Sequence, residues 1–360
     1  MNKSLLDLYS QYLQVSFSQA SATVMSELLE GTISHDKITR FLSSQEYSSQ
    51  DLWQLVKPVV RKTEKASGVL IIDDTLEEKA HMDENDLICW HYDHVNRRSL
   101  KGINMLSALY YQDQVSIPVA FELIKKTEKV IDKKTGKEKR VSAVNKNEHY
   151  RNMVRTACKN QLKFAYVLSD SWFSSAENMN TIKGELKKDF IMAIKSNRQV
   201  ALSPEDKANG KYQDVEAIQI EPHENRIVYM AKVPFALSLV KQVFKNEDGS
   251  QITLYLICSD TTIDKDQTST IYSKRWKVEE FFKSLKSNLA FNKSPAHTVR
   301  TQSNHCFAAI YGFFKMELLA LKNKTNHFAL KAKIYLNALK AAFRQLQRLQ
   351  GNDTVLINYA

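Results

Sequence analysis

Three carboxylates stand where elements of secondary structure could bring them together. Asp73 ends the apolar run GVLIIDDT and Asp170 ends the run FAYVLSDSWFS, as acids at the ends of two buried strands do. Glu279 lies in IYSKRWKVEEFFKSLK, a late segment with helical periodicity. Strands that end side by side in a sheet can unite acids that are 97 and 109 residues apart, as these successive acids are.

Such a group of acids predicts metal chemistry on a phosphodiester. Magnesium is a hard ion that takes oxygen ligands and binds a few carboxylates together with substrate phosphate. Two such ions about 4 Å apart activate the attacking oxygen and stabilise the leaving oxygen in a displacement at phosphorus. Any one of these acids also fits a turn or a helix cap, so the prediction depends on the three together.

The segment around Glu279 adds phosphate-binding groups. Tyr272, Arg275, Glu279 and Lys286 are spaced so that all four would project from roughly one face of a single helix. On that face Arg275 would bind phosphate through a bidentate fork and Lys286 as a point charge. The alternative is a surface i,i+4 pair of Arg275 with Glu279, worth only about 0.5 kcal/mol.

These four residues also resemble a family signature. They match, gap for gap, the Y-(2)-R-(3)-E-(6)-K signature of bacterial DDE transposases of the insertion sequence 4 family, and IIDDT and VLSDSWF resemble the settings of its two catalytic aspartates. The resemblance covers roughly residues 65–320. It implies an α/β, ribonuclease-H-like (retroviral-integrase-like) fold, a mixed sheet flanked by helices. It also implies cut-and-paste movement of a DNA element.

The resemblance assigns roles to individual residues. Asp73, Asp170 and Glu279 would be the catalytic, metal-binding triad for two Mg²⁺ ions, with Mn²⁺ as a substitute. Tyr272, Arg275 and Lys286 would contact DNA phosphates near the cut end. The partners would be double-stranded DNA, namely the terminal inverted repeats of the element and the target, and a second copy of the chain in a synaptic dimer.

Two neighbouring acids compete for places in this triad. Asp73 and Asp74 point to opposite sides of a strand, and the D-x-[ST] pattern of related folds favours Asp73, with Asp74 as the alternate. Glu280 is about 100° from Glu279 on a helix, so we expect it to face solvent or pair with a lysine. Trp172 could stack on an unpaired base near the cut or pack in the core.

The pattern along the chain predicts five segments. Residues 1–62 form a helical N-terminal domain, residues 63–196 the first part of the catalytic domain, residues 197–262 a β-rich insertion, residues 263–320 the rest of the catalytic domain, and residues 321–360 a C-terminal helical region for assembly. In the first segment, the break at Gly31 and a cap at Ser34 indicate a helix-turn-helix, a candidate for reading DNA.

Local signals predict several further features. Gln112, Asp113 and Gln114 separate two strand-like runs and indicate a hairpin. The lysine-rich stretch 125–146 is expected to be a solvated loop. The cluster CWHYDH, residues 89–94, lacks a second set of zinc ligands, so we expect a polar loop there instead of a zinc site.

Composition agrees with a soluble nucleic-acid enzyme. The net charge is +11, from 51 Lys and Arg against 40 Asp and Glu, which favours a polyanionic partner. Four widely separated cysteines suit neither a disulfide framework nor a zinc ribbon, and no signal peptide or membrane span is indicated. We therefore expect a cytoplasmic protein, and the resemblance implies a bacterial one associated with the nucleoid. No P-loop, dinucleotide-binding loop or nucleophile elbow is present.

Two other functions stay open. One is a catalytically silent DNA-binding protein derived from a transposase. The other is a ribonuclease-H-like nuclease that hydrolyses DNA without joining strands.

Overall fold

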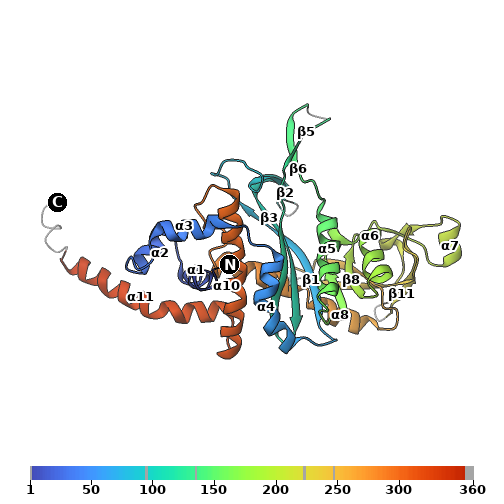
Figure 1. Cartoon of the computed structure of the whole chain (residues 1–360). Helices are drawn as coiled ribbons and strands as arrows, with labels where there is room; N and C mark the ends of the chain where they lie inside the picture. The colour runs from blue at the N-terminus through green and yellow to red at the C-terminus, as the bar shows by residue number, and fades with distance from the viewer. Residues whose placement is uncertain (1, 94–95, 134–135, 222–223, 246–247, 353–360) are drawn as a thin grey trace. The chain divides into compact units, whose positions relative to one another are not determined.

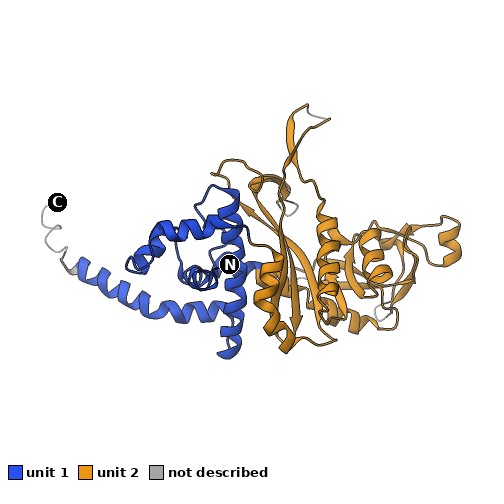
Figure 2. Cartoon of the chain, viewed as in Figure 1, with its two compact units in different colours: residues 1–46, 282–360 blue, residues 47–281 orange. Residues whose placement is uncertain are grey.

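The computed structural model describes residues 2–93, 96–133, 136–221, 224–245 and 248–352. It divides the chain into two compact units (Figure 2): unit 1 is Met1–Glu46 with Phe282–Ala360, and unit 2 is Tyr47–Phe281. None of the helices formed by the described residues combines the length and apolar character that crossing a bilayer requires.

Unit 1 is helical. It contains α1 (Lys3–Val15), α2 (Ala22–Leu28), α3 (His35–Ser44), α10 (Val299–Lys322), α11 (His327–Asn352) and the second half of α9 (Trp276–Asn288). Helix α10 is its core, because nearly every residue from Thr301 to Phe314 is buried. The Tyr9 hydroxyl bonds to His305 Nδ1 at 2.9 Å inside this core.

The turn between α2 and α3 has the chemistry expected from the sequence. Gly31 has a φ of +73°, and the Ser34 side chain accepts a hydrogen bond from the Lys37 amide at the start of α3. The predicted break and cap are confirmed, and they separate the two helices α2 and α3.

Unit 2 is built on a nine-stranded sheet (Figure 1). In spatial order its strands are β11 (Arg226–Val228), β12 (Leu237–Lys245), β13 (Gln251–Cys258), β8 (Asp189–Ile194), β7 (Tyr166–Ser169), β1 (Val69–Glu78), β3 (Arg98–Gln112) and β2 (Cys89–Asp93), with β4 (Val115–Leu123) also paired to β3. Strands β1, β7 and β8 run parallel, and the other pairs are antiparallel. The sheet is therefore mixed.

Helices flank this sheet. They are α4 (Ser49–Thr63) and α5 (Lys146–Lys159), which contact β4, together with α8 (Lys265–Ser273), which contacts β8. Shorter elements are the 3₁₀ turns η1 (Ser171–Phe173) and η3 (Val215–Ala217), the helices α6 (Ala176–Met179) and α7 (Pro204–Ala208), the π-helix η2 (Asn180–Glu185), and the strand pair β9 (Gln199–Val200) with β10 (Gln213–Asp214). Residues 197–262 thus contribute β9 to β13, and β11, β12 and β13 extend the central sheet beyond β8.

The hairpin between β3 and β4 is confirmed. Asp113 and Gln114 have φ values of +49° and +66°, as a two-residue turn that follows the twist of the strands requires. Residues 102–111, next to this turn, pair directly with β1. The hairpin therefore supports the strand that carries Asp73.

Two expected loops are strands, so those predictions were wrong. Within residues 125–146 the chain forms the hairpin β5 (Glu128–Ile131) and β6 (Glu138–Val141), which protrudes from unit 2 in Figure 1. Cross-strand ion pairs stabilise it, such as Lys129 with Glu138 at 2.8 Å. Residues Cys89–Asp93 of the CWHYDH cluster form β2, because they alternate in burial and pair with β3.

Candidate active site

Two parallel strands bring Asp73 and Asp170 to the same edge of the sheet. Strands β1 and β7 pair with Ile71 opposite Leu168, so continuing the register by two residues places Asp73 beside Asp170. Asp73 is buried, with 9% of its surface exposed. Asp170 accepts a hydrogen bond from the Trp172 amide at 3.0 Å and caps η1, so it also has the structural role that single strand-end acids often have.

Arg275 lies among the three acids. Its Nη1 is 2.8 Å from Asp73 Oδ2 and 3.4 Å from Glu279 Oε1. Asp170 also interacts electrostatically with this guanidinium. The structure therefore gathers the three predicted acids around one cation.

The acids carry more negative charge than Arg275 neutralises. Burial raises the pKa of Asp73 to about 8; the charge of Asp170 acts in the same direction, while Arg275 opposes both. Burial likewise raises the pKa of Asp170, against the hydrogen bond from the Trp172 amide. Buried carboxylates with raised pKa values are typical of functional sites.

The carboxylate oxygens of the site suit a hard divalent cation, but the acids do not lie close enough together to bind one jointly. Among residues 2–352 as far as they are described, no three His, Cys, Asp or Glu side chains lie close enough together to hold a metal ion. The oxygen donors of Asp73 and Glu279 are of the type that Mg²⁺ takes. Because Arg275 bonds to both, a divalent ion bound here would replace the guanidinium as their partner.

Asp74 faces different partners. Its Oδ2 accepts hydrogen bonds from Asn104 at 2.6 Å and from Lys146 at 2.8 Å. The Lys146 ammonium also lies 4.6 Å from the centre of the Trp172 ring, which is 39% exposed. Sequence reasoning missed Asn104 and Lys146, because no local spacing links residues 30 and 72 positions from Asp74.

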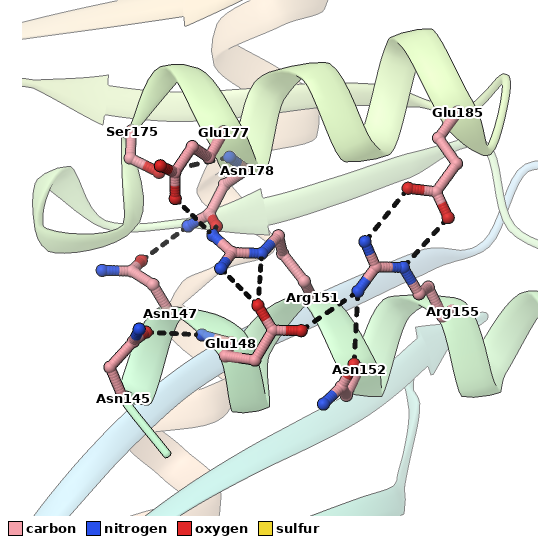
Figure 3. Close-up of polar contacts among 10 residues, drawn as sticks. All are labelled: Asn145, Asn147, Glu148, Arg151, Asn152, Arg155, Ser175, Glu177, Asn178 and Glu185. Carbon is pink, nitrogen blue, oxygen red and sulfur yellow. Dashed lines mark hydrogen bonds and ion pairs between the residues drawn. The ribbon is translucent and has the colours of Figure 1, made fainter. Parts of the chain in front are cut away.

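A polar network holds the helix that begins at Lys146 (Figure 3). Arg151 of α5 bonds to Glu177 and Asn178 of α6, each at 3.0 Å. Arg155, one turn later, bonds to Glu185 of η2 at 2.9 and 3.1 Å. These bidentate and buried contacts fix α5 against α6 and η2, so they also fix the place of Lys146.

The four signature residues do not share one helix, so that prediction was wrong. Tyr272 lies in the last turn of α8, whereas Glu279 and Lys286 lie on α9. Between them the backbone changes to i,i+3 bonds, from the Arg275 amide to Tyr272 O at 2.8 Å and from Val278 to Arg275 O at 3.1 Å. This tight turn separates two helices where the sequence pattern indicates one.

The turn gives Tyr272 a position of its own. Burial raises the pKa of the phenol to about 12, so it remains protonated at neutral pH. Its hydroxyl donates to Ser169 O at 3.3 Å, immediately before Asp170. Tyr272 therefore supports the end of β7.

The other notable residues of this segment lie on α9. Glu280 pairs with Lys277 at 2.9 Å, as expected for a residue outside the site. Lys286 is on the part of α9 that belongs to unit 1. Trp276 is 63% exposed, while most of the apolar residues after it are buried.

The CWHYDH cluster has no zinc set within the described residues. Cys89 Sγ lies 3.3 Å from His91 Nε2, and burial lowers the pKa of His91 to about 3. His94 lies outside the described residues.

Comparison with known families agrees with this geometry. Residues 2–214 match the model of the DDE superfamily endonucleases, and residues 125–311 match the model of the transposase DDE domain. No curated protein matches the chain. Each family model covers more than half of the 360 residues, and the two overlap across the second strand of the site. The chain therefore belongs to the DDE superfamily of transposases and endonucleases.

Proposed function

We propose that this protein is a cut-and-paste transposase of the insertion sequence 4 type, which cleaves the ends of a DNA element and transfers them to target DNA. The observation that carries the proposal is the convergence of Asp73, Asp170 and Glu279 on Arg275 from positions far apart in the chain. The family assignment supplies the class of chemistry.

The strand order supports a ribonuclease-H-like fold for the catalytic part. We take the strands in the order β4-β3-β1-β7-β8, antiparallel in the first two pairs and parallel in the last two, as the ribonuclease-H-like part of the sheet. In it the first two acids end neighbouring parallel strands, and a late helix supplies the third.

Asp73, Asp170 and Glu279 would hold two Mg²⁺ ions. Bound there, the ions supply an activated oxygen nucleophile and stabilise the leaving oxygen at phosphorus. If metal ions took the place of Arg275 beside Asp73 and Glu279, the guanidinium would be available to bind a phosphate at the cut end. Tyr272 keeps the strand end in place through Ser169, and we assign Lys286 to a further phosphate of the same DNA end.

Trp172 and Lys146 extend the site on the side of Asp74. The Trp172 ring is partly exposed and lies under a cation, an arrangement that suits a base or sugar–phosphate beside the cleavage point. We assign Trp172 to stacking there. Asp74 is already paired, so we assign it a positioning role for Lys146.

Basic surfaces outside the site would hold the duplex. Residues 125–146 contain nine Lys or Arg and three Asp or Glu, a net charge of +6 within 22 residues of a chain whose total is +11. Among them, Lys129, Lys133, Lys137 and Lys139 are exposed on the β5–β6 hairpin. We propose that this hairpin binds the DNA backbone. We propose that α2 and α3 read the terminal repeats. Two copies of the chain would form the synaptic complex in the bacterial cytoplasm.

The decisive experiment measures Mg²⁺-dependent cleavage of DNA carrying the ends of the element. Asp73→Asn and Glu279→Gln should each lower the rate by at least about 100-fold, the loss typical when a positioned charge is removed from a reacting centre. Asp74→Asn is the matched control and should retain cleavage within about tenfold. Equal loss in Asp73→Asn and Asp74→Asn would contradict the assignment of the triad.

The same reaction separates the two other functions. A wild-type protein that binds but never cuts the end DNA is a silent DNA-binding protein. Cut ends that are never recovered in joined target DNA identify a nuclease without transfer.

A further inference from the structure

Ser107 has a buried hydroxyl without a hydrogen bond. Its side chain is 1% exposed, and its Oγ has no hydrogen-bond partner among the described residues. A hydroxyl buried in this way costs free energy, and most buried polar groups in folded proteins are paired. A second arrangement of the surroundings, in which the hydroxyl is paired, would recover that free energy.

Strand register places this hydroxyl beside Asp73. Ser107 of β3 lies directly opposite Asp73 in the antiparallel pair of β3 with β1. Directly opposite residues project from the same face of a sheet, with Cβ atoms about 4.5–5.5 Å apart, so side-chain rotation alone can join the hydroxyl to the carboxylate. The other nearest neighbours of Ser107 on this face are apolar: Met105 and Leu109 on β3, and Phe121 opposite it on β4. The polar neighbour that the register offers is therefore Asp73.

The Asp73 carboxylate is turned to other donors. Its Oδ1 accepts from the Asp74 amide at 2.8 Å, and its Oδ2 accepts from Arg275 Nη1 at 2.8 Å. The side chains of Asp73 and Arg275 are only 12% and 17% exposed. Removing one partner of a buried ion pair leaves a buried charge, which is strongly unfavourable. A donor that takes the place of Arg275 would lower this cost.

We propose that Ser107 is a positioning residue for Asp73, whose carboxylate accepts a hydrogen bond from the Ser107 hydroxyl when Arg275 leaves. In one state Arg275 bonds to Asp73 and the hydroxyl is unpaired, which is the arrangement described above. In the other state Ser107 bonds to Asp73 and the guanidinium is available to another anion. The carboxylate has a side-chain donor in both states, so the exchange leaves no buried charge without a partner.

The neighbouring acid has its own donors on the other face of the sheet. Asp74 Oδ2 accepts from Asn104 at 2.6 Å and from Lys146 at 2.8 Å. Asn104 is three residues from Ser107 on β3, and residues an odd number of positions apart on a strand project from opposite faces. Of these two polar residues of β3, Ser107 is the one on the face of Asp73.

The exchange deepens the proposed function and rests on it for the identity of the anion. Arg275, released from Asp73, would bind a phosphate at the cut DNA end, while Asp73 becomes available as an oxygen ligand for a divalent ion. Carboxylates that bind metals are themselves held by hydrogen bonds, and loss of such a bond typically weakens metal binding by about 10–100-fold. Ser107 would supply this bond to Asp73.

A double-mutant cycle without metal or DNA tests the exchange. In the wild type, Ser107→Ala should lower the melting temperature by no more than about 1 °C, because the hydroxyl that it removes is unpaired. In an Arg275→Met background, Asp73 has lost its cation and depends on Ser107. There the same change should lower the melting temperature by at least about 3 °C, since a hydrogen bond to a charged group is lost.

Ser238→Ala is the matched control for the cycle. Ser238 of β12 is also buried, and its Oγ has no hydrogen-bond partner within the described part of the chain. Its replacement should have the same small effect in both backgrounds. Equal effects of Ser107→Ala in the two backgrounds would overturn the proposal, because the hydroxyl would then not respond to the loss of Arg275.

Mg²⁺ binding provides a second test, which does not require Arg275→Met to fold. It is measured on the full-length protein as the rise in melting temperature with Mg²⁺, in the absence of DNA. Ser107→Ala should bind Mg²⁺ at least about tenfold more weakly than the wild type, whereas Ser238→Ala should bind it equally well. An unchanged Mg²⁺ affinity in Ser107→Ala would contradict the role beside Asp73. Because neither test uses cleavage, this failure is distinct from a failure of the wild type to cut DNA.

Discussion

Arg275 and Asp73 are 202 residues apart in the chain, yet Arg275 Nη1 lies 2.8 Å from Asp73 Oδ2. Asp73 stands on β1, and Arg275 stands in the turn between α8 and α9. The same Arg275 nitrogen also pairs with Glu279, so one cation is shared by two acids of the cluster. Removing that cation should therefore separate metal binding from catalysis.

Arg275→Gln should bind Mg²⁺ roughly tenfold more tightly than the wild type, since Asp73 and Glu279 lose their competing partner. By linkage, this adds about 1.4 kcal/mol to the stabilisation that a fixed Mg²⁺ concentration provides. Cleavage at saturating Mg²⁺ should nevertheless fall, because the guanidinium is no longer there to bind a phosphate. Thermal unfolding with and without Mg²⁺ measures the first effect. Lys277→Gln, which removes a cation that pairs with Glu280 instead of the cluster, is the control. A smaller Mg²⁺ shift in Arg275→Gln than in wild type would refute this competition.

Gly102→Ala should destabilise the sheet that carries the site. A Cβ at this position would lie 2.1 Å from the Glu77 carbonyl oxygen, and Gly102 pairs with both β1 and β2. Because the contact is with backbone, we expect a loss of about 1–3 kcal/mol in the free energy of unfolding. Gly184→Ala is the matched control, since no atom lies within 4 Å of its added Cβ. Equal stability of the two variants in urea unfolding would be inconsistent with the close approach of β1 and β3.

Asp7 should make the stability of unit 1 depend on pH. Burial acts to raise its pKa, but hydrogen bonds from Lys315 and Tyr311 outweigh it and lower the pKa below the ordinary value of 3.8. A carboxylate with a lowered pKa contributes stability above its unfolded pKa and loses it as the pH falls through the folded value. Asp7→Asn should therefore melt about 1–3 °C below the wild type at pH 7, since the pair is partly exposed. At a pH below the lowered pKa of folded Asp7, the two proteins should melt together. A gap that persists there would point to poorer packing instead of a missing charge.

The β5–β6 hairpin should account for part of the salt dependence of DNA binding. Changing Lys129, Lys137 and Lys139 to Gln should reduce the slope of log affinity against log salt by up to about 0.9 for each phosphate that is no longer neutralised. Fluorescence anisotropy with end DNA in EDTA measures this without cleavage. The same change at Lys57, Lys211 and Lys245, exposed lysines elsewhere in unit 2, should leave the slope unchanged. Identical slopes in the two triple variants would remove the hairpin from the DNA-binding surface.

The sequence by itself determined the elements whose signals are local. The apolar runs before Asp73 and Asp170, the turn at Asp113 and Gln114, and the cap at Ser34 follow from side-chain periodicity and turn chemistry, which act over a few residues. The order of the acids and the gaps around Glu279 were also sufficient to suggest the class of chemistry. These features agree with the strands, turn and helix of the structure.

Only the tertiary structure decided which groups meet. The pairing of Arg275 with Asp73, and of Lys146 with Asp74, joins residues with no shared spacing. The break after Tyr272 carries no Gly or Pro signal, and the β5–β6 hairpin forms in a stretch whose charges indicated a loop. The physical reason is common to all of them: long-range contacts and strand pairing add free energy that local propensity does not contain, so they override the local pattern where it is weak.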